Sequence, residues 1–360
     1  MTSVDFSDVT GARLVLAARE TISPEDGASS AAATPLVDSF GRTIDYVRLS
    51  VTDRCDLRCR YCMAEEMTFA PRPELLTFAE IEQLVDALVD RGVRRLRLTG
   101  GEPLVRRGVE TLIDRLGRHL GRGLDELTLT TNGTQLGRMA ASIRAAGVRR
   151  INVSLDTLDP KQYQRITRRG NLGKVLVGLD AAHSAGLAVK INMVALAGIN
   201  DGEFAAMLAW CCDRGFDLTL IETMPLGLVE ENRTAHYLPL DTVREALAEH
   251  FVLSPSTLRT GGPARYYEVT GTATRLGLIT PLTQNFCAGC NRIRISATGT
   301  VYGCLGRDQH IELRPALREG DVDELHKRLD CLVSGKPRRH DFQIAAQTPA
   351  VARHMSVTGG

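Results

Sequence analysis

The stretch Cys55-Asp56-Leu57-Arg58-Cys59-Arg60-Tyr61-Cys62 places three cysteines within eight residues. Their spacing is C-x₃-C-x₂-C, and no fourth cysteine is near. An iron–sulfur cubane has four irons and normally takes four ligands, so three thiolates leave one iron open to another molecule. The run therefore predicts a catalytic cluster site. A structural zinc site is the alternative, although zinc normally takes four closed ligands.

A second set of three cysteines, Cys287, Cys290 and Cys304, has the spacing C-x₂-C-x₁₃-C. It also has no obvious fourth ligand, which predicts a second cluster with its own open iron. A zinc site remains the alternative here, with Cys331 or His310 as a conceivable fourth ligand. The other cysteines are interpreted as small buried hydrophobic residues: Cys211, Cys212 and Cys331.

The composition of the 360-residue chain excludes several classes of protein. The 44 basic and 43 acidic residues nearly cancel, giving a net charge of +1, so no overall field favours nucleic acid or membrane. No apolar run approaches the roughly 18 residues of a membrane span, and no signal peptide is evident at the N-terminus. Clustered cysteines are typical of metal or redox chemistry in a reducing compartment. A cytoplasmic protein is expected.

Strand-like and helix-like segments alternate from residue 44 onward. Six such units in about 210 residues predict a parallel sheet with right-handed crossovers, in an incomplete (β/α)6-type TIM barrel. A doubly wound sheet is the alternative. The expected strands are 46–51, 94–99, 126–130, 150–155, 188–194 and 218–223. The expected helices are 77–91, 107–119, 134–146, 172–185, 203–214 and 240–249.

The chain is predicted to have three parts. Residues 1–40 are expected to form a flexible N-terminal extension, because the stretch 24–35 consists of small and polar residues without apolar periodicity. A short helix near residues 11–20 stays open. Residues 41–250 form the partial barrel. Residues 251–360 form a C-terminal mixed α+β subdomain that carries the second cluster site. Its expected elements are strands at 265–270, 275–280, 292–297 and 300–304, followed by a helical stretch at 311–333.

Small and polar residues follow several predicted strands. Examples are Thr99-Gly100-Gly101-Glu102-Pro103, Thr130-Thr131-Asn132-Gly133, Ser154-Leu155-Asp156 and Glu222-Thr223-Met224-Pro225. In barrels the carboxyl ends of the strands carry the active site. We therefore expect these segments to lie around one site together with the first cysteine run.

The first cysteine run, with Tyr61 just before its last cysteine, resembles the radical S-adenosylmethionine (SAM) superfamily. Gly100-Gly101-Glu102-Pro103 resembles that superfamily's SAM-binding turn. The resemblance implies that SAM chelates the open iron and is cleaved to a 5′-deoxyadenosyl radical, which takes a hydrogen atom from the substrate. Glycines let the backbone approach the methionine part of SAM, and Glu102 suits its ammonium group. The SAM-contacting residues implied are Tyr61, Gly101, Glu102, Ser154 and Met224.

The segment 285–294, Asn-Phe-Cys-Ala-Gly-Cys-Asn-Arg-Ile-Arg, resembles the GTP 3′,8-cyclase family, and the resemblance extends over about residues 36–360. It implies the first step of molybdenum cofactor biosynthesis, with two [4Fe-4S] clusters. The radical abstracts the ribose 3′ hydrogen of GTP, and (8S)-3′,8-cyclo-7,8-dihydroguanosine 5′-triphosphate forms. No G-x₄-G-K-[ST] loop is present, so separate basic side chains must hold the triphosphate. The implied GTP-binding residues are Arg48, Arg97, Thr130, Lys190, Arg292, Ile293 and Arg294.

The chain ends in Gly359-Gly360. The resemblance implies that these glycines enter the active site and assist the reaction, as do Arg292 and Arg294. A terminal glycine pair is otherwise usually a disordered tail. The implied partners are a downstream cyclic pyranopterin monophosphate synthase, an electron donor and a second copy in a homodimer. Two other functions stay open: another two-cluster radical SAM enzyme, such as a peptide-modifying maturase, and a zinc-stabilised binding protein.

Overall fold

The structure is a computed structural model that describes residues 34–229, 234–343 and 349–359. Most of the predicted N-terminal extension, residues 1–33, lies outside the described residues. The described end of the extension packs on the body of the protein. Leu36 is buried, its amide donates to the Arg91 carbonyl, and Arg91 in turn donates to the Thr34 carbonyl.

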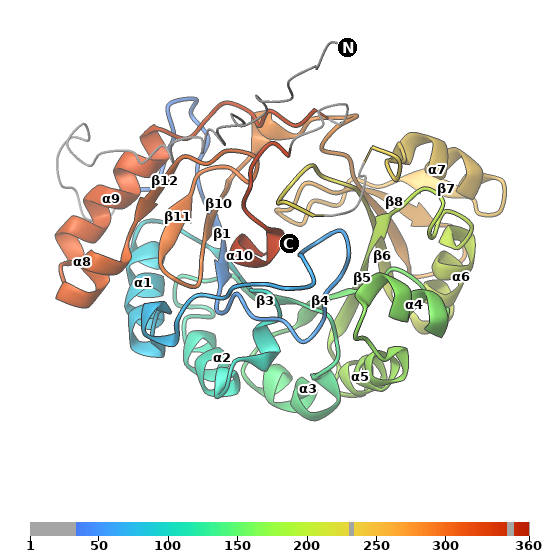
Figure 1. Cartoon of the computed structure of the whole chain (residues 1–360), viewed down its shortest axis with the longest axis horizontal. Coiled ribbons are helices and arrows are strands. Elements are labelled where there is room, and N and C mark those ends of the chain that lie inside the picture. The colour runs from blue at the N-terminus through green and yellow to red at the C-terminus, as the bar shows by residue number, and fades with distance from the viewer. Residues whose placement is uncertain (1–33, 230–233, 344–348, 360) are drawn as a thin grey trace, which may run out of the picture.

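Six parallel strands form the centre of one twelve-stranded sheet and follow one another in chain order (Figure 1). Every predicted strand of this group is confirmed to within one residue at each end. The strands are β1 (Tyr46–Ser50), β2 (Arg95–Thr99), β3 (Glu126–Thr131), β4 (Arg150–Ser154), β5 (Ala188–Ala195) and β6 (Asp217–Glu222). The fold is therefore an α/β fold with a mixed sheet, because antiparallel strands join it at both ends.

The helices between the strands lie on the outer side of the sheet (Figure 1). The six predicted helices are confirmed as α1 (Phe78–Asp90), α2 (Val109–Gly117), α3 (Leu136–Ala145), α5 (Leu172–Ser184), α6 (Phe204–Arg214) and α7 (Leu240–Ala248). Sequence analysis missed α4 (Pro160–Thr167). Its start carries a recognisable signal, since Pro160 follows Asp159, whose side chain accepts from the Gln162 amide at the N-terminus.

The C-terminal strands extend the central sheet at both edges. On one side β10 (Arg292–Ile295) pairs parallel with β1, and on the other β9 (Arg275–Ile279) pairs parallel with β6. The sheet order is β12-β11-β10-β1-β2-β3-β4-β5-β6-β9-β8-β7. The remaining edge strands are β7 (Leu253–Pro255), β8 (Arg265–Val269), β11 (Thr300–Tyr302) and β12 (His310–Glu312).

The helical stretch predicted at 311–333 is wrong at its start. Its first residues belong to the edge strand β12, and two helices follow, α8 (Arg314–Glu319) and α9 (Val322–Ser334). Gly320 separates the helices because it adopts a left-handed conformation with φ 70°, which ends α8. The apolar positions of one strand and two helices together resemble the pattern of a single long helix.

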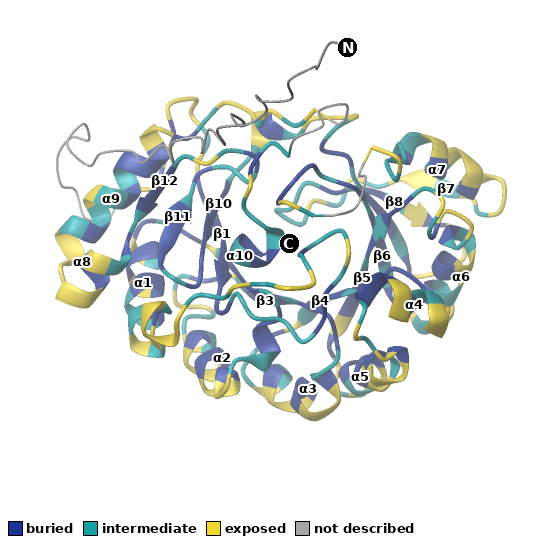
Figure 2. Ribbon diagram, viewed as in Figure 1, coloured by how far each residue is buried: buried dark blue, intermediate teal, exposed yellow. Residues whose placement is uncertain are grey.

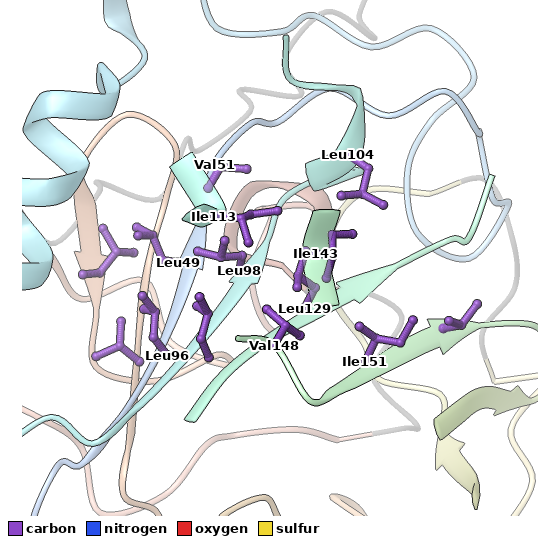
Figure 3. Packing of buried hydrophobic residues seen from close by; sticks show 14 of the residues in the cluster. Leu49, Val51, Leu96, Leu98, Leu104, Ile113, Leu129, Ile143, Val148 and Ile151 are labelled. Atoms are coloured by element: carbon purple, nitrogen blue, oxygen red, sulfur yellow. The ribbon is translucent and has the colours of Figure 1, made fainter. Parts of the chain in front are cut away.

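The central strands alternate strictly between two faces. Leu49, Leu96, Leu98 and Leu129 point toward the outer helices and pack with residues such as Ile113 of α2 (Figure 3). The intervening residues belong to the opposite, inner face and are mostly polar or charged, although several of them are buried, including Arg48, Arg97 and Lys190. Figure 2 shows that most of the central sheet is buried. Parallel strands covered on both faces by helices usually show continuous apolar runs. Alternation here indicates that the inner face encloses a polar site.

None of the described helices combines the length and the apolar character needed to cross a membrane.

Candidate active site

All six clustered cysteines line one cavity on the inner face of the sheet. The two cysteine sets are far apart in the sequence, and the sheet order brings them together because β10 lies beside β1. Most of the predicted SAM and GTP residues line the same cavity. They are Arg48, Tyr61, Arg97, Gly101, Thr130, Ser154, Lys190, Met224, Arg292 and Arg294.

Five basic residues crowd the cavity wall. Arg48 of β1 is the register partner of both Arg97 of β2 and Arg294 of β10. Arg292 lines the cavity from the same strand as Arg294, and Lys190 lines it from β5. All five are buried, and within the described residues none of them pairs with a carboxylate. The Nε atoms of the four arginines have no hydrogen-bond partner there. Buried charge without a partner is costly, so the wall is built to receive an anion.

The pKa values of the arginines reflect this crowding. Burial lowers the pKa of Arg48 well below its usual value, and the charges of Arg294 and Arg97 lower it further. Burial and the neighbouring Arg292 lower the pKa of Arg294 to about 10. A bound polyanion would relieve both effects, because an opposite charge favours the protonated form.

The loop that carries the first cysteines is held by the loops that follow β3 and β4. Asp56 accepts from Asn132 Nδ2 at 2.7 Å and from Thr134 Oγ1 at 2.6 Å. The Tyr61 hydroxyl donates to Asp156 Oδ2 at 2.7 Å. Burial raises the pKa of Asp156 to about 6. The expectation that the strand-end segments surround the cysteine run is confirmed.

The two glycines after β2 let this turn pack directly on the cysteine loop. A Cβ atom on Gly101 would lie 2.5 Å from the Arg54 carbonyl oxygen, and one on Gly100 would lie 2.5 Å from that of Thr52. The amides of Gly101 and Glu102 donate to the Thr52 and Arg54 carbonyls, each at 2.8 Å. Glycine is therefore required at both positions so that the two backbone segments can pack together.

Glu102 does not line the cavity, unlike the expectation for a residue that contacts SAM. Its Oε1 accepts from the Leu104 amide at 2.9 Å and from Thr131 Oγ1 at 2.8 Å, and its Oε2 accepts from the Asn132 amide at 2.6 Å. Burial raises the pKa of this carboxyl to about 7, against the effect of these three hydrogen bonds. Glu102 joins the ends of β2 and β3 beneath the cysteine loop.

Replacing Glu102 by glutamine is expected to lower the free energy of unfolding by about 1–3 kcal/mol, because the NH2 group that takes the place of one carboxylate oxygen cannot accept a hydrogen bond from the buried Asn132 amide. Urea unfolding followed by circular dichroism measures the change. Glu319→Gln, at an exposed position of α8, is the matched control and should change little. Equal stability of the two variants would contradict the bracing role of Glu102.

The second cysteine set lies among basic groups. Lys336 Nζ donates to Cys290 Sγ at 3.5 Å, and an Arg292 Nη approaches the same sulfur at 4.0 Å. Burial disfavours the Cys290 thiolate, but Arg292 and Lys336 outweigh it and lower the pKa of Cys290 to about 6. Arg42 Nη1 donates to the Cys287 carbonyl at 2.8 Å. The basic groups therefore favour the thiolate form that binds a metal cluster.

The conceivable fourth zinc ligands do not reach this site. Cys331 lies in the hydrophobic core on α9. His310 is the first residue of β12, its Nδ1 hydrogen-bonds the Asp308 carbonyl, and it is not among the residues that line the cavity. In the described part of the chain, no three His, Cys, Asp or Glu side chains are arranged around a single metal ion. Cys211 is also buried in the core, as predicted, whereas Cys212 is only partly buried and packs against the core.

The C-terminal tail enters the interior of the molecule, where α10 (Met355–Thr358) lies within the curve of the sheet (Figure 1). Met355 and Ser356 line the cavity, and Gly359 packs on Thr99 at the end of β2. Upstream, Val351 forms a bridge with Leu226 in the loop after β6. Gly360 lies outside the described residues.

Ile293 differs from the expectation for a side chain at GTP. It is fully buried, packs in the hydrophobic core and alternates with the two arginines that face the cavity.

Sequence analysis also missed several polar residues at the site. Tyr266 of β8 hydrogen-bonds Lys190, and Asn152 and Thr219 point inward with buried oxygens that have no partner in the described residues. Alternation along β4 and β6 was the available signal for the last two.

Comparison with known proteins supports the arrangement. Residues 49–211 match the model of the radical SAM superfamily, and residues 216–342 match that of Molybdenum Cofactor Synthesis C. GTP 3′,8-cyclase of Erythrobacter litoralis is 57% identical over 331 residues, which cover 91% of this chain and 100% of that protein. GTP 3′,8-cyclase of Rhizobium meliloti is 58% identical over 91% of this chain and 95% of its own length. The chain belongs to the GTP 3′,8-cyclase family. Membership of the radical SAM superfamily implies SAM and a [4Fe-4S] cluster.

Solved structures show the same fold outside the GTP 3′,8-cyclase family. The structure of Streptococcus suis SuiB bound to S-adenosylmethionine aligns with a TM-score of 0.57 over 82% of this chain and 66% of that chain. The sequences are 15% identical, so this likeness concerns the fold alone.

Proposed function

We propose that this protein is a GTP 3′,8-cyclase, which converts GTP to (8S)-3′,8-cyclo-7,8-dihydroguanosine 5′-triphosphate in the first step of molybdenum cofactor biosynthesis. The observation that carries the proposal is the shared cavity, which is lined by two sets of three cysteines and by five buried basic residues that pair with no carboxylate in the described part of the chain. Each set offers three thiols, and the described residues place no fourth cysteine beside either set. This donor set fits a cluster whose remaining iron binds a small molecule.

The first cysteine set would hold the SAM-binding cluster. When bound, SAM and this cluster supply the one-electron chemistry that removes the ribose 3′ hydrogen. Tyr61 and Asp156 fix the end of the cysteine loop, and the tight packing of Gly101 fixes its start. Gly101, Ser154 and Met224 face the cavity from three different strand ends, where they would contact SAM. Glu102 would hold the ends of β2 and β3 in place through its hydrogen bonds to Thr131 and Asn132.

The basic wall would hold the triphosphate of GTP. Arg48, Arg97 and Arg294 lie side by side in register, so that three guanidinium groups can share the phosphate oxygens. Lys190 approaches from β5 and is held by Tyr266. Thr130 adds a hydroxyl whose oxygen has no partner in the described residues. The second cysteine set would then hold a second [4Fe-4S] cluster that faces the guanine.

Several further assignments extend the proposal. The central strands would form a partial barrel of the (β/α)6 type, with residues 251–360 as a C-terminal subdomain and residues 1–40 as an extension. The glycine tail and the two β10 arginines would assist catalysis. A cyclic pyranopterin monophosphate synthase would take the product, and an electron donor would reduce the clusters. We further propose a cytoplasmic homodimer.

Anaerobic reconstitution followed by incubation with GTP, SAM and a reductant tests the proposal. We expect 5′-deoxyadenosine and the cyclised nucleotide to form only when GTP is present. Formation of 5′-deoxyadenosine that does not depend on GTP would instead favour another two-cluster enzyme, such as a peptide-modifying maturase. Two zinc ions and no acid-labile sulfide would end the radical hypothesis.

Replacing Arg292 by alanine is expected to weaken GTP binding about 10- to 100-fold, because a buried guanidinium at the cavity wall is lost. Isothermal titration calorimetry of the reconstituted protein measures the dissociation constant. Arg149→Ala, at an exposed position before β4, is the matched control. Unchanged affinity in the Arg292 variant would remove this residue from the GTP site.

A further inference from the structure

Lys336 is a buried lysine just beyond the end of α9. The proposed reaction gives it no role. Its side chain is held between the two arms of the second cysteine set. Nζ donates to the Gly303 carbonyl at 2.8 Å, directly before Cys304, and to Cys290 Sγ at 3.5 Å. The residue is only 3% exposed.

The charge of Lys336 has no carboxylate partner among the described residues, although a buried ammonium group normally requires one. Its acceptors are one neutral carbonyl and one sulfur. The compensating negative charge must therefore come from the sulfur side, from the cysteine thiolates and the group they bind.

The backbone next to Lys336 is fixed to the same cysteine set. Arg42 donates to the Cys287 carbonyl at 2.8 Å, to the Pro337 carbonyl at 2.8 Å and to the Arg338 carbonyl at 3.0 Å. Asp38 pairs with Arg42 at 2.5 Å and is itself buried. These hydrogen bonds connect the backbone beside Lys336 to the cysteine segment. They therefore fix the position of the ammonium group relative to the cysteines.

We propose that Lys336 is a positioning residue for the second cluster, where its ammonium group hydrogen-bonds the Cys290 ligand and raises the reduction potential of that cluster. The inference rests on the proposed function, which places a cluster on Cys287, Cys290 and Cys304. Hydrogen bonds to ligand sulfur and the net charge around a cluster set its potential. A nearby positive charge stabilises the reduced form, which carries one more electron.

The test compares four variants of the full chain after anaerobic reconstitution: Lys336→Met, Lys336→Gln, Lys336→Arg and the exposed α9 control Lys327→Met. Iron and sulfide are counted, and the potential of each cluster is titrated by electron paramagnetic resonance. The signal that changes when SAM is added identifies the first cluster, which serves as an internal reference. The glutamine variant removes the positive charge but keeps a hydrogen-bond donor. The methionine variant removes both the charge and the donor.

We expect the potential of the second cluster to shift to more negative values in the methionine variant and by less in the glutamine variant. The arginine variant, the control and the first cluster should keep the wild-type values. Loss of the second cluster in both neutral variants, but not in the arginine variant, also supports the role. An unchanged potential in a fully loaded neutral variant overturns it. Absence of a second cluster from the wild-type protein would instead refute the proposed function.

Discussion

Replacing Cys290 by serine is expected to reduce GTP cyclisation at least about 100-fold, while SAM cleavage at the first cluster continues. The neighbours of Cys290 are Arg292 and Lys336, whereas the first cysteine loop is held by separate contacts to Asn132, Thr134 and Asp156. The substitution therefore disturbs the proposed guanine site and leaves the SAM site intact. Liquid chromatography of 5′-deoxyadenosine and of the cyclised nucleotide measures the two reactions separately.

Cys212→Ser, on the outer helix α6, is the matched control and should retain both reactions. Parallel loss of both reactions in the Cys290 variant would show that the two cysteine sets do not act independently. Full cyclisation by a variant with one cluster removed would contradict the role given to the second set.

The sequence was most informative where a short motif carries the chemistry. The three-cysteine runs and Gly100-Gly101 predicted a site, and the structure brings them to one cavity. The spacing of apolar residues also predicted the six central strands and six helices, because each element buries one regular face. It could not predict that β10 would lie beside β1, since that pairing joins segments far apart in the chain.

Other residues have roles that depend on contacts between distant segments. Glu102 belongs to a recognisable turn, yet its two oxygens are used by groups from β3 and from its own turn. Lys336 is one basic residue among 44, and only the folded chain brings it to Cys290. The inward-facing Asn152 and Thr219 could have been found from the polar–apolar alternation of their strands, which a fully covered parallel sheet would not show.

The C-terminal tail offers a sharper test of the site, because its position depends on one glycine. Gly359 has φ 72°, and a Cβ atom there would lie 2.0 Å from Thr99 Oγ1. Arg353 anchors the tail upstream by donating to Asp308 at 2.8 Å and to the Leu305 carbonyl at 3.0 Å, beside Cys304. The tail therefore connects the segment of the second cysteine set with the end of β2.

Replacing Gly359 by alanine is expected to displace the end of the tail and to reduce GTP cyclisation on the order of 100-fold, with GTP and SAM binding retained. The added methyl group clashes with Thr99, and a non-glycine residue is strained at this φ. Turnover assays and calorimetry separate the two effects. Gly202→Ala is the control, because nothing lies within 4 Å of its Cβ position. Full turnover in the Gly359 variant would show that the tail has only a structural role. A residue that assists the reaction cannot be displaced from Thr99 without loss of rate.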